Sequence, residues 1–456
     1  MRIAIVGGGW SGLACAAALA HHRRQQSVHS AAKASMDITL LEAAPQCGGR
    51  ARGLLWRGHA IDNGQHLVVG AYTEFLNLLG QAQAPTWYSE PLRWTVVQRD
   101  QRITHQWRVP DQAWPLRGLA SLRPATAPRG WPWSWRWSLA TTLLGLVRNR
   151  WQVPEAHAAQ WLASQRTPAG LIDHFWRPLT EGALNTPWPL ASAQVLSNVI
   201  RDTLGGSTNA TRVLVPPRNL SLDGVDPVVA HLKAQGVTIR CGHRVTRIHC
   251  DPRPRLTLRH GEQTEPHAFD RVVLALPFHD TLRLWSDSAM PPTAAMSRLQ
   301  TLQAQAITTV WLSPREHRPD PLAGLPTWFV LAPIPGVPHI GQVVVRRENV
   351  LGVVISARAP EAVDHERDMR ELGHQLHATL GLDLNAMDCR WITEKSATWG
   401  CTPDVALAKS DEASGHTGLP FVYRCGDDLE PGYPATLESA VRSGRRTARQ
   451  LISEMA

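Results

Sequence analysis

The first forty residues alternate between apolar and glycine-rich segments in the order of a strand, a turn and a helix. Residues 2–6 alternate and carry β-branched side chains, which favours a strand. Glycines follow at 7–12, and the alanine-rich residues 13–20 are strong helix formers. Residues 37–42 have strand character again. The pattern therefore predicts the opening of a βαβ unit. Two later apolar runs, 306–312 and 350–356, predict strands of a second sheet.

Residues 131–150 contain a tryptophan-rich turn and then an apolar segment with helical spacing. One helical face of this segment holds Trp135, Leu139, Leu143 and Leu146. Tryptophan and arginine around an apolar helix are typical of an element that lies in a membrane interface. A core helix that lines a substrate site explains the same pattern, and the sequence leaves both interpretations open.

Composition and cysteine usage narrow the class of protein. Hydrophobic residues make up 43% of the chain and charged residues 19%, which is typical of a globular protein. No apolar run approaches the roughly 18 residues of a membrane span. The N-terminus enters the first strand without a signal-peptide pattern, so we expect a cytoplasmic protein, peripheral on the inner face of the membrane if 131–150 binds lipid. The seven cysteines form no C-x-x-C, so we expect neither a disulfide framework nor a metal site.

The net charge of +9 is concentrated in one stretch. Residues 101–153 contain eight arginines and a single acid, Asp111. Such an excess favours an anionic partner surface, which could belong to a membrane or to a nucleic acid. No recognised nucleic-acid-binding module is visible, so we expect no nucleic acid partner.

The glycines at 7–12 match the pattern G-x-G-x-x-G between a strand and a helix. Gly7 permits the tight turn, and Gly9 lets the backbone approach a pyrophosphate. Gly12 allows the helix to pack closely on the strand. Trp10 and Ser11 belong to the same turn, so phosphates would lie beside them at the helix N-terminus, where free N–H groups and the dipole favour negative charge.

An acidic residue at the end of the second strand is expected to accept hydrogen bonds from ribose about 20 residues after the glycines. Glu42 fits this role, although it lies 30 residues after Gly12. We interpret residues 21–35 as an extension of the loop between helix and strand. Close behind, Gly49 lets the chain pass near the cofactor, and Arg50 supplies a cation for phosphate or a flavin carbonyl.

These motifs resemble the flavin amine oxidase and phytoene desaturase superfamily. The resemblance extends to 62–66, 243–246, 272–277 and 425–444. It implies FAD as the cofactor. It also implies that cofactor contacts come from Gly64, Gln65, His66, Val245, Gly426, Asp427, Pro434, Ala435 and Thr436. In that superfamily the Gly-Asp pair meets the ribityl chain and phosphates, the valine packs on adenine, and the last helix points its N-terminus at the flavin.

Three more specific segments resemble the hydroxysqualene dehydroxylase family of squalene-associated flavoproteins in hopanoid pathways. They are 62–72, 175–195 and 394–403, and the resemblance covers nearly the whole chain. It implies reductive dehydroxylation of hydroxysqualene, an allylic C30 alcohol, to squalene, with hydride passing from reduced FAD to an allylic cation. The implied partner is a long-chain isoprenoid substrate, which needs a long apolar tunnel.

The implied reaction needs a group that protonates the leaving hydroxyl. His66 is the first candidate because its segment runs beside the flavin in related desaturases. A structural, hydrogen-bonded histidine is the alternative for this residue. Asp173, His174 and Glu181 lie on a helix-like segment and are weaker candidates, for which solvated or capping roles are the alternative.

We therefore expect an α/β fold with a discontinuous Rossmann-type FAD-binding domain and a substrate domain of mixed sheet plus helices. The FAD-binding domain would comprise 1–70, 225–285 and 385–456. The substrate-binding, membrane-facing domain would comprise 71–224 and 286–384. Two other functions stay open: an FAD-dependent desaturase or amine oxidase that acts on another isoprenoid or amine, and a lipid carrier that keeps flavin for structural reasons.

Overall fold

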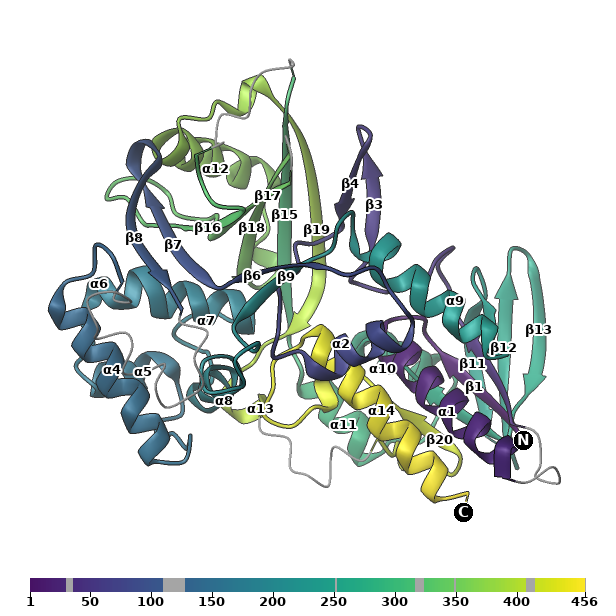
Figure 1. Ribbon diagram of the computed structural model, residues 1–456. Coiled ribbons are helices and arrows are strands. Elements are labelled where there is room, and N and C mark those ends of the chain that lie inside the picture. Colours follow the sequence, from purple (N-terminus) through teal and green to yellow (C-terminus); the bar gives the residue numbers. More distant parts are fainter. Residues whose placement is uncertain are drawn as a thin grey trace.

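The N-terminal turn lies on a five-stranded parallel sheet with the order β10-β2-β1-β14-β20. The computed structural model (Figure 1) describes residues 1–29, 36–109, 128–250, 252–315, 324–347, 350–406 and 415–455. The strands of the sheet are β1 (Arg2–Val6), β2 (Asp37–Leu41), β10 (Thr238–Arg240), β14 (Arg271–Leu274) and β20 (Val422–Arg424). Three distant parts of the chain meet here, since Val272 aligns with both Ala4 and Val422. The predicted discontinuous Rossmann-type fold is confirmed.

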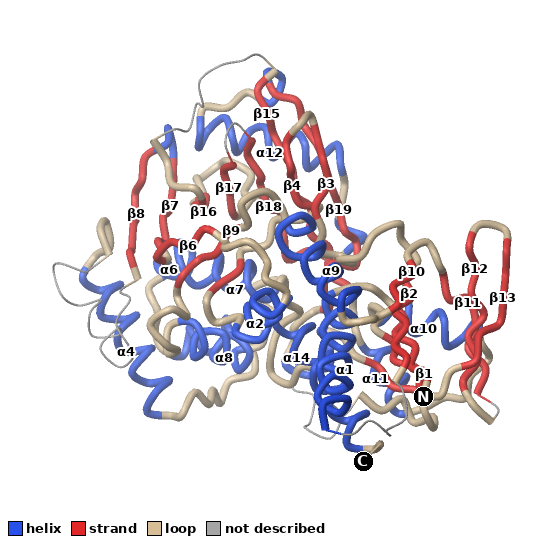
Figure 2. Tube along the Cα trace, turned by 45° about the vertical axis from the view of Figure 1, so that its right-hand side comes forward, coloured by secondary structure: helices blue, strands red, loops and turns tan. Residues whose placement is uncertain are grey.

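Two helices from opposite ends of the chain, α1 (Trp10–His29) and α14 (Leu437–Ser453), lie side by side (Figure 2). Their contact is close because position 444 is glycine. A Cβ atom on Gly444 would lie 2.2 Å from the carbonyl oxygen of Ser11. The C-terminal helix is thereby placed directly behind the glycine turn.

Helix α1 is longer than predicted. It continues from Ala20 to His29, where the sequence led us to expect a loop. The arginines and glutamines of this stretch favour helix, and Arg23 Nη1 donates a hydrogen bond to the carbonyl oxygen of Met36 at 2.8 Å. The prediction that the loop begins at residue 21 is therefore wrong, and its remainder, 30–35, lies outside the described residues.

A seven-stranded mixed sheet forms the upper part of the molecule in Figure 1, with the order β19-β15-β18-β17-β16-β7-β8. Only the β16–β7 pair is parallel among the described pairs of this sheet. Its strands are β7 (Arg93–Gln98), β8 (Arg102–Arg108), β15 (Ala304–Pro314), β16 (Trp328–Leu331), β17 (Val343–Arg347), β18 (Val350–Arg358) and β19 (Met387–Trp399). The strands predicted at 306–312 and 350–356 lie within β15 and β18 and pair with each other.

The described residues also form three smaller sheets. They comprise β3 (Gly53–Trp56) with β4 (His59–Asp62); β5 (Val68–Val69), β9 (Arg212–Val215) and β6 (Tyr88–Pro91); and the meander β11 (Arg244–Cys250), β12 (Pro254–His260) and β13 (Gln263–Ala268). Further helices are α2 (Thr73–Gln81), α9 (Asp226–Ala234), α10 (Phe278–Asp287), α11 (Ala294–Thr301), α12 (His365–Leu380) and α13 (Pro403–Ala406). Short turns of helix are η1 (Arg99–Gln101), η3 (Ser221–Val225), η4 (Pro360–Ala362), η5 (Leu384–Ala386) and η7 (Asp427–Leu429).

A group of helices packs against β7 and β8 through an aromatic core. The helices are α4 (Trp133–Arg148), α5 (Ala158–Ser164), α6 (Ala169–Leu171), the π-helix η2 (Ile172–Trp176), α7 (Arg177–Leu184) and α8 (Ala193–Thr203). Trp94, Trp107 and Trp131 surround Phe175, with ring centroids 5.1 to 5.9 Å from it. These edge-to-face contacts unite the strands and the helices in one core.

The predicted face of α4 is buried in this core. Leu139, Leu143 and Leu146 have at most 3% of their surface exposed, and Trp135 stacks on His105 with ring centroids 5.0 Å apart. This face therefore agrees with the core interpretation. None of the described helices combines the length and apolar character that a membrane span requires.

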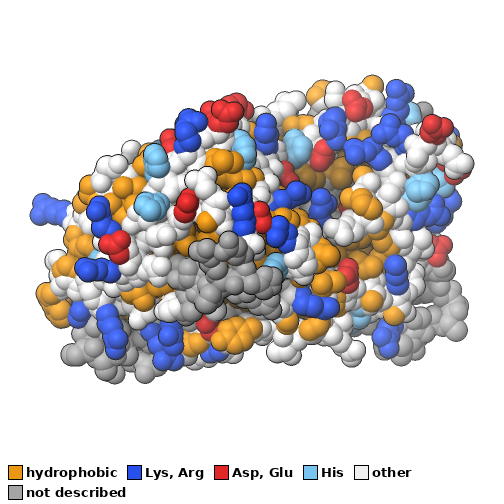
Figure 3. Space-filling model, turned by 90° about the horizontal axis from the view of Figure 1, so that it is seen from above, with side chains coloured by type: hydrophobic (Ala, Val, Ile, Leu, Met, Phe, Trp, Pro, Cys, Tyr) orange, Lys and Arg blue, Asp and Glu red, His pale blue; other side chains and the backbone are white. Residues whose placement is uncertain are grey.

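Positive side chains are widespread on the surface. In the view of Figure 3, Lys and Arg side chains are spread over the whole face and are more frequent than Asp and Glu. Within the basic stretch, Arg102, Arg108 and Arg129 are exposed. Arg117, Arg123 and Asp111 lie outside the described residues.

Candidate flavin-binding site

The glycine turn after β1 has the geometry that a bound pyrophosphate requires. Gly7 has a φ of +111°, and a Cβ there would lie 2.3 Å from the carbonyl oxygen of Ala275. A Cβ on Gly12 would lie 2.1 Å from the carbonyl oxygen of Gly7. Gly9 lies against Gly49, and a Cβ added to Gly49 would lie 3.1 Å from the Cα atom of Gly9. Because these positions carry no side chain, a phosphate group has room to reach the backbone N–H groups at the N-terminus of α1.

Trp10 and Ser11 occupy the first turn of α1, as predicted, but their side chains point into the protein. The Trp10 indole donates a hydrogen bond to the Ala51 carbonyl oxygen at 3.1 Å and packs on Phe75. Ser11 has only 7% of its surface exposed. These two residues therefore offer backbone N–H groups, rather than side chains, to a cofactor.

Glu42 follows β2 directly and lies beside the glycine turn. Its carboxylate accepts hydrogen bonds from the backbone N–H groups of Gly8 and Ala44, both at 2.7 Å. The long spacing from Gly12 thus leaves the acid where the motif predicts it, because the added residues extend α1 away from the site. The N–H of His243 donates to the Glu42 carbonyl oxygen, which brings the start of β11, and with it Val245, to the same end of the sheet.

Arg50 connects the N-terminal motif with the C-terminal motif. Its Nη2 atom lies 2.9 Å from Asp427 Oδ2, and its Nη1 atom donates to the carbonyl oxygen of Ala397 at 2.7 Å. Gly426, next to Asp427, donates its N–H to Ser443 of α14. The segments around positions 50 and 427 therefore lie together, although 377 residues separate them.

The segment 64–66 lies next to Arg50 and presents polar atoms without protein partners. Asn63 Nδ2 donates to the Arg50 carbonyl oxygen at 2.7 Å, and the N–H of Gln65 donates to Thr309 of β15 at 3.3 Å. The side-chain amide of Gln65 and the Nε2 atom of His66 are buried, and no described residue forms a hydrogen bond with them. Such unpaired atoms cost about 1–3 kcal/mol each, so they indicate a place for a polar ligand.

The surroundings of His66 favour the neutral imidazole. Its pKa is lowered to about 4, chiefly by burial and also by the positive charges of Arg347 and Arg50. Arg347 is held beside the site by an ion pair with Asp62 at 2.9 Å. At neutral pH the His66 ring therefore offers one N–H donor and one acceptor nitrogen.

The weaker acid candidates form contacts within the helical region. Glu181 is 8% exposed and accepts from Arg177 Nε at 3.2 Å and from the N–H of Trp188 at 3.3 Å. His174 Nδ1 lies 2.8 Å from the Gly170 carbonyl oxygen. Asp173 lies with His174 in the π-helix η2. Neither Glu181 nor His174 has a described hydrogen bond to the segments around Arg50 and Asp427.

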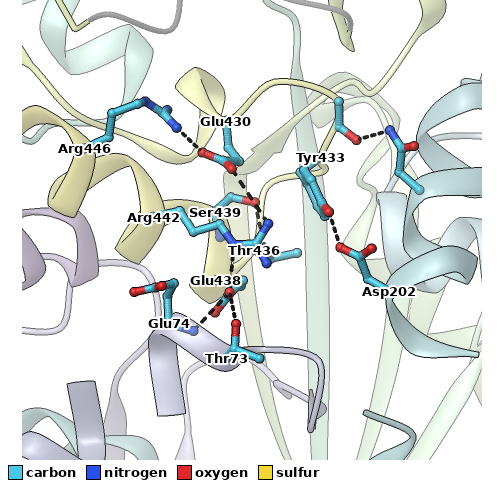
Figure 4. A network of polar contacts seen from close by, with 12 residues as sticks. Thr73, Glu74, Asp202, Glu430, Tyr433, Thr436, Glu438, Ser439, Arg442 and Arg446 are labelled. Carbon is cyan, nitrogen blue, oxygen red and sulfur yellow. Dashed lines mark hydrogen bonds and ion pairs between the residues drawn. The ribbon is translucent and has the colours of Figure 1, made fainter. Parts of the chain in front are cut away.

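The N-terminus of α14 has the form that was predicted for 434–436. Thr436 is the N-cap, and its hydroxyl accepts from the N–H of Ser439 at 3.1 Å. Ser439 in turn donates its hydroxyl to the Pro434 carbonyl oxygen at 2.7 Å. Arg442 lies over the Tyr433 ring, 4.8 Å from its centroid, and Figure 4 shows Tyr433 pointing toward Asp202 of α8. The loop before α14 is thereby tied to α8.

Two structural residues were missed from the sequence. Glu438 is 3% exposed and accepts a hydrogen bond from the N–H of Glu74 at the start of α2 (Figure 4). It also accepts one from the N–H of Phe75. Asn185 donates to Thr398 Oγ1 at 2.8 Å and so joins two of the family-specific segments. The sequence indicated these two residues only in that Glu438 lies in segment 425–444 and Asn185 in segment 175–195, which both resemble the family. Contacts between side chains that are distant in the sequence leave no local pattern.

A family profile described as flavin containing amine oxidoreductase matches residues 10–452. The chain belongs to this family. As a member of it, the protein is a flavoprotein oxidoreductase with FAD as its cofactor. The predicted cofactor and enzyme class are thus confirmed.

The chain of this amine oxidoreductase is similar to curated relatives over its whole length. It is 27% identical to the hydroxysqualene dehydroxylase of Rhodopseudomonas palustris and 25% identical to that of Zymomonas mobilis, with 98% of each chain covered in both cases. Among solved structures, an oxidoreductase from Methanosarcina mazei gives a TM-score of 0.71 at 16% identity, covering 99% of this chain and 100% of that chain. A redesigned putrescine oxidase gives 0.68 at 17% identity, with 99% of both chains covered. The predicted family resemblance is confirmed, and the solved structures support the fold.

The residues of this family member fit the cofactor. A side chain would not fit in the glycine turn, the Glu42 carboxylate lies beside that turn, and the buried side-chain amide of Gln65 and Nε2 atom of His66 have no hydrogen-bond partner among the described residues. Among the described residues, no group of three His, Cys, Asp or Glu side chains has the arrangement of a metal site.

Proposed function

We propose that the protein catalyses the FAD-dependent reductive dehydroxylation of hydroxysqualene to squalene. The observation that carries this proposal is the full-length similarity to hydroxysqualene dehydroxylases from different bacteria. It is supported by the contact between Asn185 and Thr398, since this contact joins segments on which the specific resemblance rests. When bound, reduced FAD supplies the hydride that replaces the hydroxyl group, which leaves with a proton as water.

We assign the cofactor contacts to the residues of the sequence motifs. The backbone of the glycine turn and of α1 would bind the pyrophosphate, Glu42 the ribose, and Val245 the adenine. Arg50 and Asp427 would hold the central part of FAD, its phosphates and ribityl chain. The N-terminus of α14 would stabilise negative charge on the flavin ring. The full proposed set is Gly7, Gly9, Trp10, Ser11, Gly12, Glu42, Gly49, Arg50, Gly64, Gln65, His66, Val245, Gly426, Asp427, Pro434, Ala435 and Thr436.

His66 is the residue that we propose to act on the leaving hydroxyl. Its unpaired Nε2 atom and its place next to Gln65 support this role. Because burial favours the neutral ring, proton donation by His66 would require lower pH or a neighbouring negative charge, and the ring would otherwise orient the hydroxyl. The contacts of Glu181 favour a structural role for that carboxylate.

We also propose the division of the chain into two functional parts. Residues 1–70 and 225–285, with the C-terminal part, would bind FAD, while 71–224 and 286–384 would bind the isoprenoid. Strand β19 pairs with β15 in the seven-stranded sheet. The C-terminal part would comprise 385–456, so its first strand, β19, would also contribute to the sheet of the substrate-binding part. Because a C30 isoprenoid alcohol partitions into lipid, the substrate-binding part would work beside a membrane, in the region of 131–150.

An anaerobic half-reaction tests the proposed activity. Holoenzyme reduced with dithionite should regain its yellow absorbance when detergent-dispersed hydroxysqualene is added, and squalene should form in equal amount. Absence of both changes in protein with a full complement of FAD would contradict the proposal. Bleaching of the oxidised enzyme by an amine or another isoprenoid would instead support an oxidase or desaturase.

A further inference from the structure

Helix α4 has two apolar faces, and one of them is exposed. The inner face packs into the aromatic core, as described above. On the outer face, Trp133, Trp137 and Leu144 have 62%, 56% and 63% of their surface exposed. Their spacing of four and seven residues places them in one stripe along the helix. Large exposed apolar side chains gathered in this way mark an interaction surface.

Within residues 128–153, which contain the stripe, every charged side chain is an arginine. Arg129 lies before the helix, Arg148 in its last turn and Arg150 just after it, and all three are exposed. Residues 128–153 contain no Asp or Glu. A second copy of this chain would bring like charges together, whereas an anionic surface would neutralise them.

The position of α4 leaves it accessible to a flat partner. In both Figure 1 and Figure 2, α4 lies at the outer edge of the molecule, far from the N- and C-termini. The helix has 16 residues and does not qualify as a membrane span. Such a helix is suited to lie along a surface, with its core-facing side already occupied.

We propose that the outer stripe of α4, formed by Trp133, Trp137 and Leu144, docks on a lipid bilayer with anionic headgroups. The indole rings would enter the headgroup boundary, where tryptophan is favoured. Arg129, Arg148 and Arg150 would contact lipid phosphates. This face is opposite to the one predicted from Trp135, Leu139 and Leu143. Its purpose, access to a lipid-dissolved substrate, rests on the proposed function, whereas the contact itself does not.

Vesicle flotation of the holoenzyme tests the contact without substrate. Vesicles of phosphatidylcholine alone are compared with vesicles that also contain phosphatidylglycerol. The wild type should bind the anionic vesicles, and the W133S/W137S variant should bind them at least about tenfold less. R129Q/R148Q/R150Q should lose the preference for phosphatidylglycerol. The control L55S/Y88S removes side chains that are 74% and 60% exposed on other elements and should bind as the wild type does.

Three outcomes would overturn the proposal. The wild type could fail to float with either vesicle, or W133S/W137S could float as well as the wild type. Sedimentation could also show a dimer that depends on Trp133 and Trp137, which would assign the stripe to a second copy. Vesicle binding without turnover of detergent-dispersed hydroxysqualene would support the docking surface and contradict the proposed reaction, so the two failures are distinguishable.

Discussion

Arg50 is held by oxygen atoms that come from the other end of the chain. Asp427 provides a carboxylate at 2.9 Å, and Ala397 provides a carbonyl oxygen. The side chain of Arg50 is only 28% exposed and that of Asp427 only 12%. Removal of one partner would therefore leave a partly buried charge without its counterion.

We expect Arg50→Ala to weaken FAD binding at least about tenfold, because the segments around positions 50 and 427 lose their connection. Titration of apoprotein with FAD measures the effect. Arg57→Ala is the matched control, since Arg57 forms a surface pair with Asp388 and is 49% exposed. Equal FAD affinity in both variants would contradict the role of Arg50.

For His66→Gln we expect a loss of about 10²–10⁴ in kcat, with FAD content preserved. If the protonated ring is the acid, kcat of the wild type should rise as the pH falls from 7 toward the lowered pKa of about 4. His66→Gln should abolish that rise. The control is His59→Gln in the β3–β4 hairpin. A wild-type kcat in His66→Gln would contradict a role of His66 in the reaction.

The sequence predicts residues well where the reason is local. Gly7 and Gly12 are required by contacts within a single turn, so their pattern alone predicts the geometry. The meeting of Arg50 with Asp427 was expected only through the family resemblance, because nothing local connects them. Glu438 was missed, since an acid in a first helical turn ordinarily indicates interaction with its own helix.

Helices α2 and α14 are joined through one carboxylate. Glu438 accepts from two backbone N–H groups at the start of α2, and Arg442 Nε lies 2.8 Å from it. It thus satisfies donors that α2 leaves open at its N-terminus. The contact fixes α14 against the element that follows the 64–66 segment.

We expect Glu438→Ala to lower the free energy of unfolding by about 2–4 kcal/mol, because two N–H groups and Arg442 lose their partner. Thermal and urea unfolding measure the change. Glu366→Ala is the control, since Glu366 is an exposed acid in the first turn of α12. If Glu438→Ala lowers the free energy of unfolding no more than Glu366→Ala does, the contact of Glu438 with α2 does not stabilise the fold.

Helix α4 shows why its orientation could not be predicted from spacing. Leu139, Leu143 and Leu146 form one apolar stripe, and Trp133, Trp137 and Leu144 form another. When apolar residues lie on opposite sides of a helix, periodicity does not tell which side is buried. Tertiary packing decides which side is buried, as in the stacking of Trp135 on His105 of β8.

The whole molecule contains several histidines that burial keeps neutral. Burial chiefly lowers the pKa of His66, His105 and His339 to about 4. The unfolded chain binds protons at these sites near pH 6.5, whereas the folded protein does not. The unfolded state therefore gains more protons as the pH falls, and the fold loses stability between about pH 6.5 and 4.

In the double variant His105→Gln/His339→Gln, the free energy of unfolding should fall less between pH 7 and pH 5 than in the wild type. We expect a difference of roughly 1–3 kcal/mol, which allows for the half-buried position of His105. Urea unfolding at pH 7 and pH 5 measures it. The control is His249→Gln, at an exposed position of β11. An unchanged slope in the double variant would contradict the role of the two buried rings.

At the scale of the molecule, the α/β class and the second sheet could be predicted from apolar runs, but the sheet that β19 joins could not. Strand β19 is only partly buried along much of its length, so its sequence gives no sign of its partner. Its pairing with β15 is a long-range contact, which leaves no local pattern.

Hydrogen–deuterium exchange with and without FAD tests whether both ends of the chain close around one flavin. We expect FAD to protect two distant segments together: the glycine turn with residues 42–50, and the C-terminal segment 426–437. Protection at both ends, with the exposed β12–β13 hairpin unchanged as an internal control, would support a single flavin site closed by both ends of the chain. Protection of one end alone, or of neither in folded protein, would contradict it.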